Sequence, residues 1–319
     1  MNSRERIQAA VAGERPDRLP AAFWRPGEKG GTAEDHARTA MDFAAEWDSD
    51  LLVTAPSVGY SGEDYTAPGF TKVGGVAYVT DPADWERLSG GSVNHGALAR
   101  EQDALKQILA EKHAGLPVVF RVTSPLATIF RLAFHLPEDI RRGAGPMVKA
   151  ALKTVTETTC ALVQRVIELG ADGIFFEAPL ADYELLSESV YREYGAPYDL
   201  AVLSASSGWC NVLAAGWTNC MFPVLRKYPV QIFAWDAAQS LPEIAEARDL
   251  MGVCCMTGLS RRHLEFGLRN EVEQDIWRAV SASGGRGLIL SAGASVQPGP
   301  GMADFVKKSI RDIADRAAR

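Results

Sequence analysis

Eight short apolar runs alternate along this chain with longer segments of helical character. Each run has four to six residues, and a charged residue interrupts only one of them, at Arg121. Parallel strands that are buried on both faces have this continuous apolar character. The runs are Pro20–Phe23, Leu51–Thr54, Pro117–Val122, Gly173–Phe176, Asn211–Ala214, Val230–Trp235, Gly252–Thr257 and Gly287–Ser291. This alternation predicts an α/β fold, a (β/α)8 TIM barrel.

The segments between the runs carry the pattern of amphipathic helices. They are Thr32–Trp47, Gly96–Ala114, Pro146–Leu169, Ser187–Tyr194, Asn219–Tyr228, Leu241–Leu250, Asn270–Ser283 and Gly301–Ala318. Gly170 follows one of them and is expected to end it in a left-handed conformation. The segment Ser57–Gly91 is too long for a plain loop and alternates over Thr71–Val79, so it predicts a hairpin over the barrel mouth. With 319 residues, the chain has the size of one barrel, a single domain over residues 1–319.

Charge and cysteine content exclude several classes of partner. The net charge of -7 offers no basic surface for nucleic acid or anionic lipid. No stretch approaches the roughly 20 apolar residues of a membrane helix, and the charged start Met1–Arg18 is not a signal peptide. The five cysteines form no CxxC pair and are expected to be reduced thiols. We therefore expect a cytoplasmic protein that acts on a small molecule.

Two carboxylates lie where strands of the predicted barrel end, which is where barrel enzymes carry their active sites. Glu177 follows Gly173–Phe176, and Asp236 follows Trp235. Burial disfavours the charged form of such groups, so Glu177 and Asp236 are predicted as the catalytic acid and base. Asp236 has an alternative role as a cap of the helix that follows it.

Further polar and aromatic side chains belong to the same predicted mouth. Arg121 lies inside an apolar run and requires a carboxylate partner, either from a substrate or from Glu177. Aromatic side chains there can line a pocket for a substrate. The residues predicted to bind substrate at the mouth, besides Arg121, are Arg25, Lys29, Tyr60, Trp217, Asn219 and Trp235.

Several blocks of the sequence, in order, are similar to those of the uroporphyrinogen decarboxylase superfamily, which includes corrinoid-dependent methyltransferases. They are Ser3-Arg4-Glu5-Arg6, Asp17-Arg18-Leu19-Pro20, Phe23-Trp24-Arg25, Ser124-Pro125-Leu126, Gly170-Ala171-Asp172-Gly173, Trp235-Asp236 and Gly284-Gly285-Arg286-Gly287. Together they span nearly the whole chain. The resemblance implies a TIM barrel and a homodimer.

This resemblance also implies where the chain departs from the superfamily. Zinc-dependent methyltransferases of this kind carry metal ligands after the fifth and eighth strands. The corresponding positions hold Ala214 and Gly216, and then Ala294, whose side chains cannot bind zinc. We therefore expect no metal and no cofactor.

The decarboxylases of the superfamily hold substrate carboxylates with two arginines four residues apart. Arg25 and Lys29 keep this spacing and charge, although they can also form a solvated loop pair. The decarboxylases' aspartate after the second strand is replaced within Thr54-Ala55-Pro56, and their later histidine corresponds to Ala294. A tetrapyrrole substrate is therefore not expected.

Three functions are compatible with these residues. The first is a metal-independent decarboxylase or lyase that acts on a carboxylate-bearing small molecule through Glu177 or Asp236. The second is a methyltransferase of the corrinoid-linked type that has lost zinc and either moves a methyl group with the help of a general base alone or works with a corrinoid protein. The third is a noncatalytic binding homologue. We expect an enzyme of the first kind, because the best-known decarboxylase of the superfamily needs no cofactor.

Overall fold

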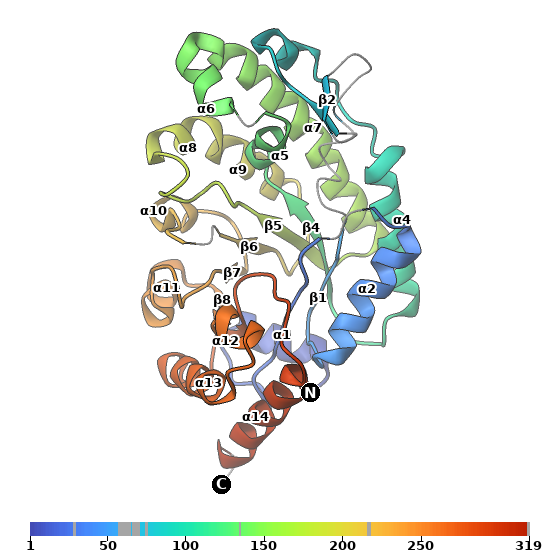
Figure 1. Cartoon of the computed structure of the whole chain (residues 1–319). Helices are drawn as coiled ribbons and strands as arrows, with labels where there is room; N and C mark the ends of the chain where they lie inside the picture. Colours follow the sequence, from blue (N-terminus) through green and yellow to red (C-terminus); the bar gives the residue numbers. More distant parts are fainter. Residues whose placement is uncertain are drawn as a thin grey trace.

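A parallel sheet forms the centre of the molecule. The computed structural model describes residues 1–27, 30–56, 65, 71–73, 76–133, 135–215 and 218–317. Seven strands pair in the order in which they occur along the chain, and all of these pairs are parallel (Figure 1). The strands are β1 (Leu52–Val53), β4 (Val118–Thr123), β5 (Gly173–Glu177), β6 (Val212–Ala214), β7 (Ile232–Ala234), β8 (Cys254–Gly258) and β9 (Leu288–Ser291). Each lies within, or within one residue of, a predicted apolar run.

The sequence predicts a closed barrel of eight strands, but the sheet has seven, because the first apolar run does not form a strand. Within Pro20–Phe23, Ala21 makes one isolated parallel bridge to Leu290 of β9. Its carbonyl oxygen accepts a hydrogen bond of 2.7 Å from the backbone N–H of Asp50, just before β1. Pro20 has no N–H to donate, which limits the ladder that so short a segment can form. The fold is an incomplete parallel α/β barrel of seven strands.

Helices follow the strands and cover the sheet (Figure 1). The longer ones are α2 (Ala33–Glu46), α4 (Gly96–Glu111), α7 (Gly145–Leu169), α13 (Arg269–Ser283) and α14 (Met302–Ala317). The shorter ones are α1 (Ser3–Val11), η1 (Pro82–Arg87), α5 (Pro125–Leu132), α6 (Leu136–Asp139), η2 (Ile140–Ala144), α8 (Glu188–Tyr194), α9 (Ala196–Ser204), α10 (Phe222–Leu225), α11 (Ile244–Met251) and α12 (Arg261–Glu265). Gly170 ends α7 with φ of 110°, as predicted. None of these described helices has the length and apolar character that crossing a membrane requires.

The predicted hairpin is present. Strands β2 (Thr71–Val73) and β3 (Val76–Tyr78) pair in antiparallel fashion. Directly after β3, the backbone N–H of Val79 donates a hydrogen bond of 2.8 Å to the carbonyl oxygen of Leu132. Leu132 ends α5, the helix that follows β4. The hairpin is therefore attached on the side of the sheet where β4 ends.

The apolar core has two layers, on the two faces of the sheet. Each strand contributes one or two alternating residues to the inner layer: Val53, Val119, Phe175, Val212, Ala214, Ile232, Ala234, Cys254, Met256 and Ile289. Ile7 and Ala10 of α1 belong to this layer as well. Neighbouring strand residues such as Phe120 and Phe176 belong to the outer layer, which packs against the helices. This alternation follows from the two-residue period of side chains along a strand.

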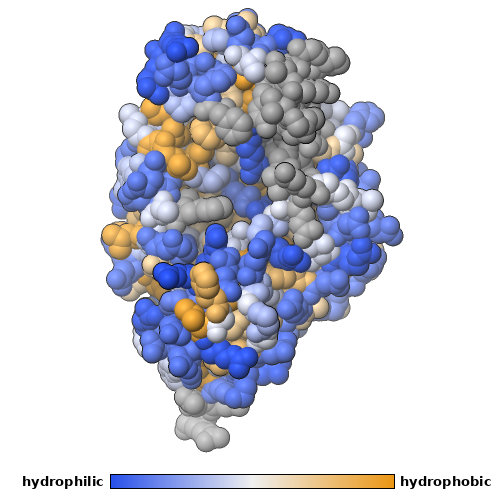
Figure 2. Space-filling view, in the orientation of Figure 1, coloured by the Kyte–Doolittle hydropathy of each residue, from blue (hydrophilic) through white to orange (hydrophobic). Residues whose placement is uncertain are grey.

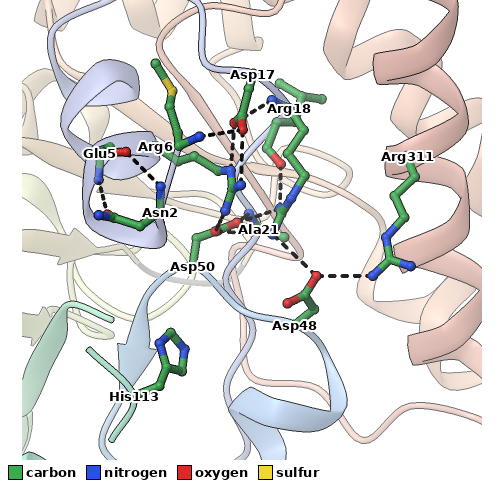
Figure 3. Close-up of polar contacts among 12 residues, drawn as sticks. Asn2, Glu5, Arg6, Asp17, Arg18, Ala21, Asp48, Asp50, His113 and Arg311 are labelled. Carbon is green, nitrogen blue, oxygen red and sulfur yellow. Dashed lines mark hydrogen bonds and ion pairs between the residues drawn. The ribbon is translucent and has the colours of Figure 1, made fainter. Parts of the chain in front are cut away.

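A network of charged side chains joins the N-terminal segment to the start of β1 (Figure 3). The carboxylate of Asp50 is fully buried. It accepts hydrogen bonds of 3.1 Å from Arg6 and 2.7 Å from Arg18, and a third of 3.1 Å from the backbone N–H of Ala21. Arg6 also pairs with Asp17 at 2.7 Å. A buried carboxylate needs such partners, so this network keeps α1 beneath the inner core.

Candidate active site at the carboxyl ends of the strands

Three side chains at the ends of neighbouring strands lie on the inner face of the curved sheet. They are Arg121 on β4, Glu177 on β5 and Ala214 on β6, and each lies two positions after an inner-core residue of its own strand. Because side chains alternate along a strand, these residues form the next inward-facing layer. Glu177 and Ala214 are direct partners in the register of β5 and β6. The layer lies at the carboxyl ends of the strands, as the sequence predicts.

This layer contributes to a pocket of about 90 Å³. The described residues that line the pocket are Trp24, Arg121, Arg131, Glu177, Pro179, Ala214, Ala215, Gly293, Ala294 and Ser295. Trp24 packs edge-on against Phe175 of the inner core, with 4.7 Å between ring centroids. The pocket therefore lies directly above the inner core and combines three charged side chains with small apolar ones. On the face drawn in Figure 2, hydrophilic residues predominate and hydrophobic ones occur as separate patches.

Arg121 and Glu177 form an ion pair in this pocket, with 2.7 Å between Nη2 and Oε1. Their side chains are only 12% and 19% exposed. Arg121 also donates from Nη1 to the carbonyl oxygen of Arg25 at 3.1 Å, and its backbone N–H donates to Thr54 Oγ1 at 2.9 Å. The planar guanidinium is thereby held in one orientation, and it holds the Glu177 carboxylate in turn. Of the two partners predicted for Arg121, the structure contains Glu177.

Arg131 is a pocket residue that the sequence analysis missed. It belongs to α5 and lies partly buried beside the end of β4, with Nη1 3.5 Å from Thr123 Oγ1. The signal in the sequence is that Arg131 is the only charged residue of a helix with the sequence PLATIFRL. A charged side chain on an otherwise apolar helix is rarely buried without a polar environment. On a helix that follows a barrel strand, it is expected to extend towards a polar site at the barrel mouth.

Asp236 is buried, at 2% exposure, but it is not among the described residues that line the pocket. Its carboxylate accepts hydrogen bonds from Gln239 Nε2 at 2.6 Å and from the backbone N–H of Ala238 at 3.1 Å. Burial raises the pKa of this carboxyl, and these two hydrogen bonds act in the opposite direction. These contacts lie within a turn, because the next helix, α11, begins only at Ile244 and has Glu243 as its N-cap. The alternative role of Asp236 as a cap of that helix is therefore wrong.

Gly293 brings the loop after β9 close to Asp236. This glycine lines the pocket and has φ of +66°. A Cβ atom added there would lie 1.7 Å from the carbonyl oxygen of Trp235 and 2.7 Å from the backbone nitrogen of Asp236. Only glycine allows this approach. Asp236 thus lies behind the pocket wall rather than on its surface.

The other predicted substrate-binding residues have different positions. Arg25 is partly buried, and its carbonyl oxygen contacts Arg121. Trp235 is fully buried, and its indole N–H donates to the carbonyl oxygen of Pro242 at 3.0 Å. Asn219 is exposed, with Nδ2 3.4 Å from Glu184 Oε1. The remaining three, Lys29, Tyr60 and Trp217, lie outside the described residues.

The pocket does not suit the zinc site of the resembling methyltransferases. Ala214 and Ala294, which the resemblance places at two of the ligand positions, both line the pocket, and their methyl groups cannot bind a metal ion. Gly216 lies outside the described residues. In the part of the chain that the structure describes, no three His, Cys, Asp or Glu side chains are grouped to bind a metal ion. The side chains present would hold an anion rather than a zinc ion.

Comparison with known proteins identifies relatives by sequence. The family described as Uroporphyrinogen decarboxylase (URO-D) matches residues 31–303. The methylcobamide:CoM methyltransferase MtbA of Methanosarcina acetivorans is 27% identical over 231 residues, which are 63% of this chain and 66% of that protein. MtbA of Methanosarcina mazei is 30% identical over 132 residues, which are 40% of this chain and 38% of that protein. These matches span less than two thirds of either relative.

Solved structures resemble the whole chain in fold. A methyltransferase from Methanosarcina mazei superposes with a TM-score of 0.80 at 16% identity and covers 100% of both chains. A B12-independent methionine synthase from Shewanella sp. W3-18-1 superposes with a TM-score of 0.58 at 13% identity and covers 95% of both chains. At these identities the likeness extends to the fold.

Proposed function

Because the chain belongs to the uroporphyrinogen decarboxylase family, we propose that it is a methyltransferase of the corrinoid-linked type that works without zinc. The family predicted from the sequence is thereby confirmed. The curated relatives are named methylcobamide:CoM methyltransferases, which favours methyl transfer over the decarboxylase that the sequence analysis preferred. In this proposal the methyl donor is a methylcobamide on a corrinoid protein, and the acceptor is a small anionic molecule.

The observation that carries the proposal is the Arg121–Glu177 ion pair in a pocket that is also lined by Ala214 and Ala294, which the resemblance places at metal-ligand positions. An acceptor that gains a methyl group must lose a proton if its nucleophilic atom carries one. Glu177 is the carboxylate of the pocket and is proposed to take this proton. Arg121 keeps the carboxylate oriented towards the pocket. Asp236, behind the wall, is proposed to support the loop after β9.

A second candidate is a metal-independent decarboxylase or lyase. The observation in its favour is that the same pocket contains two guanidinium groups, from Arg121 and Arg131, which suit a carboxylate-bearing substrate. Arg25 and Lys29 are proposed to assist in binding that carboxylate. A homodimer in the cytoplasm is proposed for either activity.

The test compares the two reactions in one preparation. Purified protein is incubated with methylcobalamin and a panel of small thiols and acids, and loss of the methyl group is followed by absorbance. For methyl transfer, we expect demethylation that depends on both protein and acceptor. Carbon dioxide release without demethylation would support the lyase instead. If neither reaction occurs, both proposals are contradicted and the noncatalytic homologue remains.

A Glu177→Gln variant tests the proton acceptor within this assay. We expect kcat to fall about 100-fold while KM changes little, because the amide keeps the shape but cannot accept the proton. The matched control is Glu168→Gln, at a carboxylate that is 66% exposed and pairs with Arg165 on the outer surface of α7. An equal kcat for Glu177→Gln and wild type would contradict the assignment.

A further inference from the structure

We propose that a cavity at the amino ends of β1 and β4 binds a small uncharged molecule with an apolar body and one hydroxyl group. The cavity has a volume of about 280 Å³. It lies between the second half of α2, the start of β1 and the segment that leads from α4 into β4. The described residues that line it are all different from those that line the candidate active site, at the carboxyl ends of the strands. The proposal therefore concerns a second site and goes beyond the proposed function.

Small side chains on α2 leave room for this cavity. Helices α2 and α4 pack against each other, and α2 presents Ala44 and Ala45 to the cavity. Met41, Leu52 and Leu116 supply apolar walls, and the two leucines belong to the buried core. Apolar walls favour a ligand whose apolar surface leaves water on binding. An apolar cavity of about 150 Å³ is large enough for benzene, so this one can hold a single ring with a substituent.

A buried hydroxyl group without a partner lies at the cavity, that of Ser49. The chain turns from α2 into β1 at Asp48, whose φ of 51° is the only positive one of a non-glycine residue in the described chain. Ser49 follows, and its backbone N–H donates to the carbonyl oxygen of Ala44 at 2.9 Å. Ser49 is 5% exposed and lines the cavity, and no described group forms a hydrogen bond with its Oγ. A buried hydroxyl without a partner is unfavourable, so a ligand that supplies the missing hydrogen bond is stabilised.

The charged groups at the rim of the cavity balance one another. The carboxylate of Asp48 already contacts two arginine side chains, at 3.4 Å and 3.6 Å. Glu111 and Lys112 carry opposite charges, and Lys112 Nζ donates to the carbonyl oxygen of Leu116 at 2.7 Å. His113 Nδ1 donates to the carbonyl oxygen of the next residue at 3.2 Å, and Figure 3 shows its ring apart from the network around Asp50. A charged ligand would lose its hydration without gaining a counter-charge here, which favours an uncharged head group.

The test is a ligand-observed NMR titration with phenol, toluene and benzoate, three molecules with one ring and different head groups. Wild-type protein should bind phenol about fivefold more tightly than toluene, because the phenol hydroxyl can pair with Ser49 Oγ. Benzoate should bind more weakly than phenol. Ser49→Ala should lower the affinity for phenol to that for toluene and leave toluene binding unchanged. This variant should fold like wild type, because it removes a hydroxyl that has no partner in the described chain.

Ala45→Phe tests the place of binding. Ala45 is exposed at the edge of the cavity, so a large side chain there can fill the space without entering the core. It should abolish the binding of phenol and toluene. Ser283→Ala is the matched control, at a serine that is 3% exposed, lies outside the cavity lining and donates to the carbonyl oxygen of Val280 at 3.3 Å. It should bind phenol like wild type.

Three outcomes would overturn the proposal. Wild-type protein that binds phenol no more tightly than toluene would show that the Ser49 hydroxyl does not select the ligand. A Ser49→Ala variant that keeps the preference for phenol would show the same. Wild-type binding in Ala45→Phe would place phenol elsewhere on the protein.

Discussion

Asp199 is a carboxyl group that lies among tyrosines, away from the candidate active site. It belongs to α9 and is fully buried, and it accepts hydrogen bonds from the hydroxyl groups of Tyr191 on α8 and of Tyr228, the latter at 2.9 Å. Burial raises the pKa of Asp199 to about 7, although the two hydrogen bonds favour the charged form. The residue is thus protonated in the folded protein under mildly acidic conditions.

This raised pKa predicts a pH-dependent stability. The contribution of Asp199 is fully present below the pKa of the unfolded chain, 3.8, and is lost as pH rises to about 7. A shift of this size corresponds to about 4 kcal/mol. Asp199→Asn cannot ionise, so its unfolding free energy in urea should fall less between pH 5 and pH 8 than that of wild type.

The control for this experiment is Asp42→Asn, at an exposed aspartate of α2, which should keep the wild-type pH dependence. Equal pH slopes for Asp199→Asn and wild type would show that Asp199 titrates normally in the folded protein.

Sequence patterns indicate which residues lie at strand ends, but not which of their side chains enter the pocket. Glu177 and Arg121 could be placed at the mouth, because strand periodicity fixes which face they occupy. Asp236 ends a neighbouring strand in the same way, yet its carboxylate turns to Gln239 and Ala238 behind the wall. The position of Asp236 behind the pocket wall depends on the loop at Gly293, which is distant in the sequence.

At the scale of elements, the charged network around Asp50 joins three segments that contribute little sequence signal by themselves. They are α1, the segment around Pro20 and the approach to β1. Arg6 of α1, and Arg18 and the backbone N–H of Ala21 on either side of Pro20, donate to the carboxylate of Asp50, which precedes β1. We predict that Asp50→Asn lowers the unfolding free energy by about 3–5 kcal/mol, because Arg6 and Arg18 keep their charges without their partner. Urea unfolding measures this loss.

Asp48→Asn is the matched control, since Asp48 is 51% exposed and contacts Arg18 and Arg311 at 3.4 Å and 3.6 Å. Its effect should stay below about 1 kcal/mol. Similar losses for the two variants would mean that the burial of Asp50 adds nothing to the network.

The predicted helix Asn219–Tyr228 shows why element boundaries differ from the pattern. Helix α10 begins only at Phe222. The carboxylate of Asp182 accepts hydrogen bonds from the backbone N–H groups of Thr218 and Asn219, at 2.9 Å and 3.1 Å. These contacts hold residues 218–219 in a bend instead of a helix. Asp182 is 36 residues away from Thr218 in the sequence, so local periodicity cannot reveal its effect.

At the scale of the whole molecule, one sheet carries both core layers, so we predict that residues 1–319 unfold as a single cooperative unit. Circular dichroism reports the helices, and fluorescence reports tryptophans spread along the chain, including buried Trp24, Trp85 and Trp235. The two signals should have the same urea midpoint. Two separate midpoints would indicate two folding units.

The alternation of apolar runs and helical segments determined the order of the strands and the end of the sheet at which the candidate site lies. Both follow from periodicities that act over a few residues and from the parallel direction of strands joined by helices. The pairing of Arg121 with Glu177, the entry of Arg131 into the pocket and the incomplete first strand were decided by the tertiary structure. Each depends on distances between segments far apart in the chain, which local sequence patterns do not encode.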